Sequence, residues 1–395
     1  MANHVLKSLL LLLIQPVFIS GLIYSFINYR RRVEYTRKTY RVNFVRENFE
    51  IKNFLFKGII PGLVFSLLSV GIGVQLTIEW FILYQLITIV LLLIGGSRLI
   101  HPIFTFSLTS IGYKVLSLLS FNIPLLPFKQ LYQLNDFTYN AVINQNQLIT
   151  NTLFIASLIL LFSIYLLIDR EESRLYPVLR TSKRGKSVAK YQRKSLWLLP
   201  LMVIVPGEAF SKIASWWPLL EINGESYALL FMPILVGFHF TISTQLIHEA
   251  TALIKKDFRY VGFTGLATFI IAYFIPAFSI WGVGLLFLFS FGVLIRHRRR
   301  EKEWAFRYGP TNEGLRVIAI RSESPADRMS LSVGDTILEM NDTQMNSIED
   351  YNRVVAYNRS YIKMRVLRVD NEIVMVQTPL YDDDFNSLGL LILDN

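Results

Sequence analysis

The chain has 395 residues, of which 52% are hydrophobic, 14% are aromatic and 17% are charged. Soluble proteins carry about 25% charged residues, so this composition excludes a disordered chain and disfavours an ordinary soluble enzyme. The chain contains no cysteine, which excludes disulfides, thiol nucleophiles and cysteine-bound metal sites, and five histidines remain for metal or acid–base chemistry.

The net charge of +11 is distributed unevenly. Residues 1–307 carry a net charge of +17 and residues 308–395 carry −6, which predicts two regions of different chemistry joined near residue 305. In the first region the basic residues lie between apolar runs. This is the pattern of the cytoplasmic loops of a membrane protein, and it points away from nucleic acid as a partner.

Apolar runs of about 17–25 residues can cross a bilayer, and such runs fill the first region. The clearest is Leu153–Ile168, whereas 99–119 is weaker because it contains Lys114. The segment 260–295 holds either two short crossings or one segment kinked at Pro276. We therefore expect a multi-span transmembrane domain over residues 1–300 with about eight or nine helices. The predicted spans are 8–28, 54–74, 79–97, 99–119, 150–168, 195–213, 227–247, 260–275 and 278–295.

The first run is predicted to be a transmembrane helix rather than a signal peptide. It lacks a strongly basic leader and an obvious small-residue cleavage site, and it ends in the sequence Asn28-Tyr29-Arg30-Arg31-Arg32. A basic flank of this kind is typical of a stop-transfer segment.

The basic loops predict the orientation, because such loops stay in the cytoplasm. With nine crossings all of them lie on one side, the N-terminus is outside and the C-terminal region is cytoplasmic, whereas eight crossings would place the N-terminus inside. The cytoplasmic C-terminus is the firmer prediction, since Arg296–Arg300 directly precede it. Besides setting topology, basic segments attract anionic lipids by about 1 kcal/mol per residue. The basic segments are 30–46, 169–194, 248–259 and 296–302.

Polar groups inside spans mark functional sites by default, and Lys114 and His239 qualify, with Gln245 nearer a helix end. Lys114 lies near the predicted outer end of its span, where its ammonium reaches the headgroups. We expect His239 to hydrogen-bond a neighbouring helix. Two isolated polar groups do not make a proton relay or an ion path.

No catalytic motif is complete in this sequence. His248-Glu249 begins the zinc-protease pattern H-E-x-x-H, but Ala252 stands where the second histidine is required. A G-x-S-x-G motif in a span and a G-x-x-x-x-G-K-[ST] phosphate loop are also missing. We therefore expect no enzyme, no cofactor and no metal site, and we place His248 and Glu249 at the inner end of a helix.

From Tyr308 the sequence changes to short β-type runs. Gly314–Ile320 alternates as a strand should, and Ser347 with Asp350 forms an S-x-x-D helix start, close to a capping box. The further predicted features are a short helix opened by Ser324-Pro325-Ala326, a strand after Gly334-Asp335 that reaches Asn341, a helix over about Ser347 to Tyr357, and two strands at 361–369 and 372–378 joined at Asp370-Asn371.

This order of residues resembles a PDZ domain of the bacterial type over about 310–380. Two positions depart from the family pattern: Met329-Ser330 replaces the usual Ala-Gly, and Asn341-Asp342 replaces the usual Asn-Gly turn. Neither change threatens the fold. The expected architecture is therefore an α-helical polytopic membrane bundle followed by a small α+β, β-barrel-like PDZ domain over residues 308–381.

The resemblance implies peptide binding by strand addition, in which an extended peptide joins the edge of the first strand and faces the helix. For the helix residues the alternative is ordinary packing of an amphipathic helix on the sheet. Glu313 precedes the loop that receives a peptide carboxylate in this family, and its charge disfavours a second anion. An internal peptide segment is therefore at least as well suited as a C-terminus. The implied groove residues are Gly314, Leu315, Arg316, Val317, Tyr351, Val354 and Val355.

Residues 382–395 form an acidic and then apolar tail, in which Asp382-Asp383-Asp384 leads into Leu388–Leu393. The apolar part is either an extra strand that closes the domain or a short ligand for another copy of the chain or for the membrane.

A catalytically empty multi-span anchor with one C-terminal PDZ domain has the layout of a scaffold. This layout, together with the stretch Lys57–Val64 that opens the second span, resembles the MinJ family of cell-division topological determinants in rod-shaped Gram-positive bacteria. The resemblance implies a scaffold at septa and poles that bridges the polar coiled-coil protein DivIVA and the MinCD division inhibitor through MinD. The alternatives are a PDZ-regulated transporter or membrane enzyme, and a secretion or quality-control accessory protein.

Overall fold

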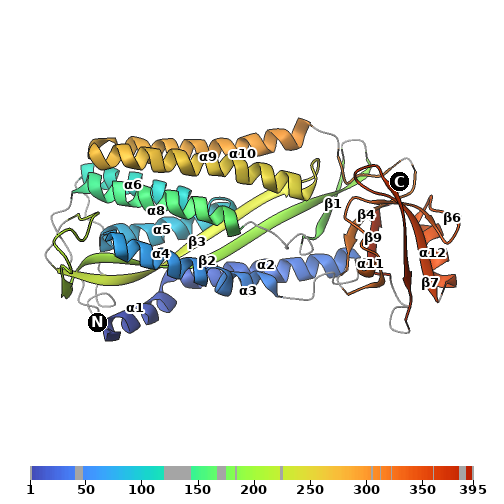
Figure 1. Ribbon diagram of the computed structural model, residues 1–395, viewed down its shortest axis with the longest axis horizontal. Coiled ribbons are helices and arrows are strands. Elements are labelled where there is room, and N and C mark those ends of the chain that lie inside the picture. The colour runs from blue at the N-terminus through green and yellow to red at the C-terminus, as the bar shows by residue number, and fades with distance from the viewer. Residues whose placement is uncertain are drawn as a thin grey trace.

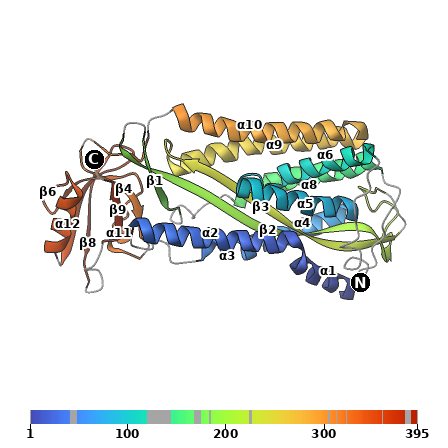
Figure 2. The ribbon, with the colours of Figure 1, turned by 180° about the vertical axis from the view of Figure 1, so that it is seen from behind.

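The computed structural model describes residues 2–40, 48–119, 144–166, 175–182, 185–222, 226–303, 306–311, 313–321, 323–358, 360–381 and 388–393. Helices surround a long β-hairpin to form an elongated bundle, and a smaller region of strands and short helices lies beyond one end of it (Figure 1). The N-terminus lies toward the opposite end in both views (Figure 2).

The helices of the bundle begin and end at recognisable sequence signals. Thr77 caps α5 by accepting a hydrogen bond from Trp80 N, and His101 with the following proline starts α6. The bundle helices are α1 (Ala2–Ile14), α2 (Pro16–Tyr40), α3 (Phe49–Lys52), η1 (Asn53–Lys57), α4 (Ile59–Ile72), α5 (Ile78–Gly95), η2 (Gly96–Arg98), α6 (Pro102–Leu118), α8 (Gln145–Leu166), α9 (Ile247–Phe274), η4 (Pro276–Phe278) and α10 (Ser279–Glu303).

Fewer helices than predicted have the length and hydropathy of a membrane span. In the described parts of the chain four of them do, and a fifth is added if α1 and α2, bent by 47° at their junction, form one span. Residues 260–295 form two helices, α9 and α10, that reverse at Pro276, so the single kinked segment is wrong. The four candidate spans are Phe49–Ile72, Ile78–Arg98, Gln145–Ile164 and Pro276–Lys302.

The predicted helices at 195–213 and 227–247 are wrong, because most of both segments forms strands. β2 (Ser187–Ser211) pairs antiparallel with β3 (Ser226–Ile242), and β1 (Pro177–Thr181) adds to the beginning of β2. Both segments are apolar on both faces, and such a run has no period that separates a strand from a buried helix. Pro200, Pro206 and Pro233 interrupt helix hydrogen bonding in the middle of these segments.

The hairpin forms the centre of the core, with packed side chains on both of its faces. On one face Trp197, Leu199 and Met232 belong to the main hydrophobic cluster of the bundle. On the other face Leu196, Leu198 and Leu235 form a second cluster that includes Val17 of α2 and Phe54 of η1.

The outer edge of β2 is satisfied by the α4–α5 segment of the chain. Ser66 Oγ accepts a hydrogen bond from Met202 N at 2.9 Å and lies 3.3 Å from the Pro200 carbonyl oxygen. Ile204 exchanges backbone hydrogen bonds with Val74 and Leu76, at 3.2 and 2.9 Å. These contacts supply the hydrogen-bond partners that water would give an exposed strand edge and that an apolar bundle does not provide.

The outer edge of β3 is satisfied mainly by polar side chains from α1, from the junction of α1 and α2, and from α5. Phe231 N donates to Ser8 Oγ at 2.8 Å, and Gln15 Nε2, at the junction of α1 and α2, donates to Phe231 O at 2.9 Å. Tyr84 OH donates to Pro233 O at 3.2 Å. Pro233 lies opposite Pro200 in the register, so neither edge carries an N–H at this position.

Two glycines let α4 approach the edge of β2. A Cβ added at Gly62 would lie 2.6 Å from the Pro200 carbonyl oxygen, and one at Gly58 would lie 1.8 Å from the Leu198 carbonyl oxygen. The stretch Lys57–Val64, which contributed to the family resemblance beside the layout, is therefore the place where a helix meets the hairpin backbone.

We predict that Gly62→Ala lowers stability, whereas Gly71→Ala on the same helix does not. A methyl group at Gly62 overpacks the contact with Pro200, which costs about 1–3 kcal/mol. Nothing lies within 4 Å of a Cβ at Gly71, so alanine there is expected to stabilise the helix by up to about 1 kcal/mol. Thermal midpoints of the detergent-purified variants measure both effects. Equal midpoints would contradict the close contact.

The C-terminal region is a mixed helix and antiparallel-sheet structure, and the predicted strands and helices are present. Ser347 and Asp350 form the expected capping box. The sheet order is β8-β7-β5-β4-β9, with β6 paired to β5, and no described pairing joins its ends, so a barrel-like closure is not seen. The elements are β4 (Leu315–Ile320), α11 (Pro325–Arg328), β5 (Thr336–Met340), β6 (Thr343–Gln344), α12 (Ile348–Tyr357), β7 (Tyr361–Leu367), β8 (Ile373–Pro379) and β9 (Leu390–Leu393).

Candidate functional site

The predicted peptide-binding strand, β4, lies between two other strands. Gly314 opens it with φ of +77°, and a Cβ there would lie 2.4 Å from Ile337 O, so glycine is required. Leu315 and Arg316 pair with β5. On the opposite edge Arg316 and Val317 pair with β9. The edge on which a peptide was expected is therefore occupied by the chain's own C-terminal strand.

The apolar end of the tail forms an extra strand, which is one of the alternatives for this segment. Arg321 N donates to Gly389 O at 2.8 Å and Ala326 N donates to Leu388 O at 3.1 Å, which fixes the start of β9. The acidic part, Asp382-Asp383-Asp384, lies outside the described residues. The sheet thus includes residues beyond the predicted boundary at 381.

The predicted helix wall contributes to the core of the C-terminal region. Tyr351 and Val354 are buried in the same cluster as Leu315 and Val317, and Val355 packs against that cluster while partly exposed. α12 lies on the side of the region away from the bundle, whereas β4 and β9 lie toward the bundle (Figures 1 and 2). The packing role of these residues is clear, and their role in a groove stays a prediction.

β4 and β9 also contact the hairpin of the bundle. Tyr191 OH donates to the carbonyl oxygen of Ile318, and Ala189 N donates to Tyr308 O at 2.9 Å. The ring centroids of Tyr191 and Tyr308 lie 4.7 Å apart, and the two ring planes make an angle of 71°. Ile318 and Leu393 are buried in the main cluster of the bundle. The two regions are thus joined through an apolar contact as well as through the chain.

A pocket lies between the first turn of α9 and the C-terminal region. His248 and Glu249 line it from the first turn of α9, and Asp335 and Arg368 line it from the other side; their place at the inner side of the membrane stays a prediction. Burial raises the pKa of the Asp335 carboxyl, which accepts a hydrogen bond from Ser332 N at 2.8 Å. In the described part of the chain no group of three or more potential ligands could hold a metal ion.

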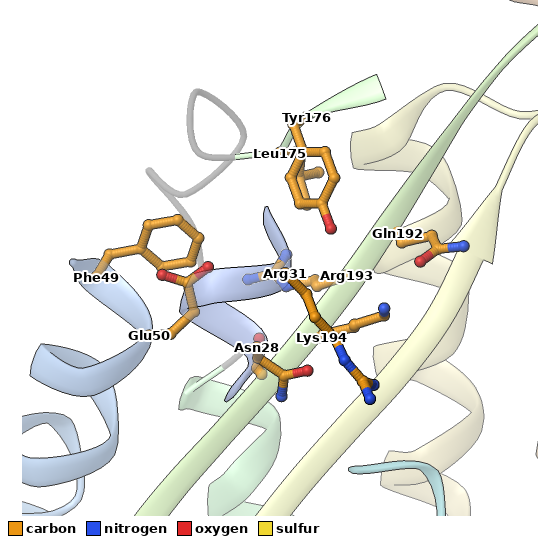
Figure 3. A pocket seen from close by; sticks show the side chains of 10 residues that line it. Asn28, Arg31, Phe49, Glu50, Leu175, Tyr176, Gln192, Arg193 and Lys194 are labelled. Atoms are coloured by element: carbon orange, nitrogen blue, oxygen red, sulfur yellow. The ribbon is translucent and has the colours of Figure 1, made fainter. Parts of the chain in front are cut away.

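Another pocket lies where α2 and α3 cross β2 (Figure 3). Behind it Arg32 forms a buried ion pair with Glu50, at 2.6 and 3.1 Å, and its guanidinium lies 4.7 Å from the Phe49 ring centroid. In the sequence Arg31 and Arg32 form one basic run. In the structure Arg31 is exposed, whereas Arg32 is buried, with 1% of its surface exposed. Only tertiary contact with Glu50 separates their roles.

We predict that Glu50→Gln destabilises the protein strongly, whereas Glu34→Gln on the exposed face of α2 does not. Removing one member of a buried ion pair typically costs about 3–5 kcal/mol. Glu34 pairs with Lys38 at 2.7 Å, but both side chains are more than half exposed, so solvent screens that pair. Denaturation midpoints of the two variants test this difference. A Glu50→Gln protein as stable as Glu34→Gln would show that the buried pair is dispensable.

The three polar residues that the sequence places in or near the predicted spans differ in their hydrogen bonding. Lys114 Nζ donates to Gln145 Oε1 at 3.3 Å, and Gln145 begins α8. Gln245 Nε2 donates to Glu301 Oε1 at 3.0 Å. His239 lies on a strand, and its Nε2 has no hydrogen-bond partner in the described part of the chain, so the expected bond from this nitrogen to a helix is absent.

These features define a polytopic membrane protein with a mixed helix and antiparallel-sheet region at its C-terminal end. No family model matches the chain. It is nevertheless a distant homologue of the cell division topological determinant MinJ of Bacillus subtilis (strain 168), with 23% identity over 99% of this chain and 95% of that protein. It is also 22% identical to the probable cell division topological determinant MinJ of Lacticaseibacillus paracasei, over 55% of this chain and 58% of that protein.

Proposed function

We propose that the protein is a non-enzymatic membrane scaffold that helps to select the division site. The observation that carries this proposal is similarity to a cell division topological determinant along nearly the whole chain, including both the bundle and the C-terminal region. In the same proposal residues 308–381, completed by β9, form a cytoplasmic PDZ-like domain. The basic ends of α2 and α10 lie next to that domain, which supports the cytoplasmic orientation.

The PDZ-like domain acts in this proposal by strand exchange. β9 lies antiparallel on β4, which is the arrangement of a strand-addition ligand. A partner segment with alternating apolar residues replaces β9 along β4, where Arg316 and Val317 pair with it, just after Gly314 and Leu315. Tyr351, Val354 and Val355 support this edge from the core cluster that they share with Leu315 and Val317.

The partners in this proposal are the membrane-associated division proteins that the family resemblance implies. A DivIVA-like protein marks the poles and septum, and a MinD-like protein carries the division inhibitor. The scaffold joins them at the bilayer, and it is expected at septa and poles. Self-association through exchanged β9 strands is compatible with the same edge.

We predict that a fluorescent fusion of the full chain concentrates at septa and poles of dividing cells. Val317→Asp places a charge in the core under the proposed edge and is expected to scatter the fusion or to uncouple the inhibitor and produce minicells. Met375→Asp is the control, because Met375 is 55% exposed on β8. A uniform membrane signal for the unmodified chain would refute the proposed role in division.

We predict that a synthetic peptide of residues 387–395 binds a chain that ends at Asn386 and does not bind the full chain. In the shortened chain the β4 edge is open, whereas β9 occupies it in the full chain. Ile392→Asp in the full chain is a second way to open the edge, since Ile392 is 8% exposed and packs in the core of this region. Fluorescence anisotropy of the labelled peptide measures binding. A folded, shortened chain that ignores the peptide would exclude strand exchange.

A further inference from the structure

Five elements of the bundle bring a basic side chain to one place at the end that faces the C-terminal region. Lys194 of β2 lies directly opposite His239 of β3, so both side chains share one face of the hairpin. Arg31 of α2 lines the same pocket as Lys194, and their side chains lie next to one another in Figure 3. Arg98 of η2 lines the adjoining pocket with His239. We call the four cations Arg31, Arg98, Lys194 and Arg298 of α10, together with the His239 ring beside them, the cation cluster.

The charges of the cation cluster act on one another. Burial is the main cause that lowers the pKa of the Lys194 ammonium; Tyr24 opposes it, and the guanidiniums of Arg31 and Arg98 lower the pKa further by smaller amounts. Burial and the positive charges of Arg98, Lys194 and Arg298 lower the pKa of the His239 ring, which lies outside the candidate spans. The cluster is therefore a region of concentrated positive potential.

The cation cluster lacks anions of its own, unlike the basic residues around it. Arg32 pairs with Glu50, and Arg296 and Arg300 both pair with Asp257. Among the described residues no carboxylate forms an ion pair with Arg31, Arg98, Lys194 or Arg298. In addition, the buried Nε2 of His239 has no hydrogen-bond partner there. These groups match a ligand that carries negative charge and several hydrogen-bonding oxygens.

An exposed apolar surface leads directly to the cation cluster. Ile23 and Ile27 are 54% and 39% exposed on α2, within two turns of Arg31. Leu93 and Ile94 are 81% and 77% exposed on α5, just before Arg98. Tyr24 OH accepts a hydrogen bond from Ser97 N at 3.0 Å, which joins the two helices at this level. The change from apolar to basic at one level on both helices is the signature of the edge of the hydrocarbon core.

We propose that the cation cluster binds the phosphate headgroup of an anionic phospholipid, whose acyl chains lie along the exposed residues of α2 and α5. A headgroup supplies the missing negative charge, and the apolar surface beside the cluster is what distinguishes a lipid from free phosphate. The inference is independent of the proposed role in division, since it concerns how the bundle sits in a bilayer of mixed lipids.

The test compares lipid binding by the full-length chain and two charge-matched triple variants. The cluster variant is Arg31→Gln, Arg98→Gln and Lys194→Gln. The control is Arg37→Gln, Lys256→Gln and Arg299→Gln, which removes the same charge from exposed positions at the same end of the bundle. Native mass spectrometry in detergent, with added phosphatidylglycerol or phosphatidylcholine, counts retained lipids.

We expect the unmodified chain to retain phosphatidylglycerol over phosphatidylcholine and the cluster variant to lose about 100-fold in affinity, since each cation contributes roughly five-fold. The control should keep the preference. Equal losses in both variants would mean that the basic residues form only a general charged surface, and displacement by millimolar inorganic phosphate would mean a free-anion site. Either result overturns the proposal. If the cluster variant does not fold, a charge-conserving triple variant, Arg31→Lys, Arg98→Lys and Lys194→Arg, is tested in addition. This variant must retain the preference for phosphatidylglycerol over phosphatidylcholine.

Discussion

The backbone of the β2–β3 hairpin imposes the constraint on which the rest of the structure depends. A two-stranded hairpin leaves alternate N–H and C=O groups unpaired along both outer edges, and unpaired groups in an apolar interior cost several kcal/mol each. The surrounding helices supply the missing partners through Ser66 on one edge and through Ser8, Gln15 and Tyr84 on the other. Polar residues of the surrounding segments therefore hydrogen-bond the edges of the hairpin. This role explains their presence among apolar residues without an ion or proton path.

The same hairpin links the membrane part to the C-terminal region. β2 begins where Ala189 and Tyr191 contact Tyr308 and Ile318, and it continues through the bundle to Ser211. The C-terminal region is thus held against the membrane part by hydrogen bonds and ring contacts of β2.

The sequence predicted the C-terminal elements well because their signals are local: a capping box at Ser347, a turn at Asp370 and alternation from Gly314. It failed at 195–213 and 227–247 because strands buried on both faces show no period, although three prolines argued against long straight helices there. The pairing of Arg32 with Glu50, and of β4 with a strand about 70 residues away, depends on tertiary contacts that no local pattern encodes.

Successive side chains of β9 point to opposite faces of the strand, so the strand packs into two hydrophobic clusters. Ile392 packs into the core of the C-terminal region, whereas Leu393 on the opposite face of the strand is buried in the main cluster of the bundle. A partner segment that replaced β9 would have to fill both surfaces. A segment that filled only the first would bind β4 and at the same time loosen the contact with Tyr191 and the hairpin. In the proposed scaffold, recruitment of such a partner would remove the part of the contact that Leu393 makes, whereas the hydrogen bonds of Tyr191 with Ile318 and of Ala189 with Tyr308 do not involve β9 and would remain.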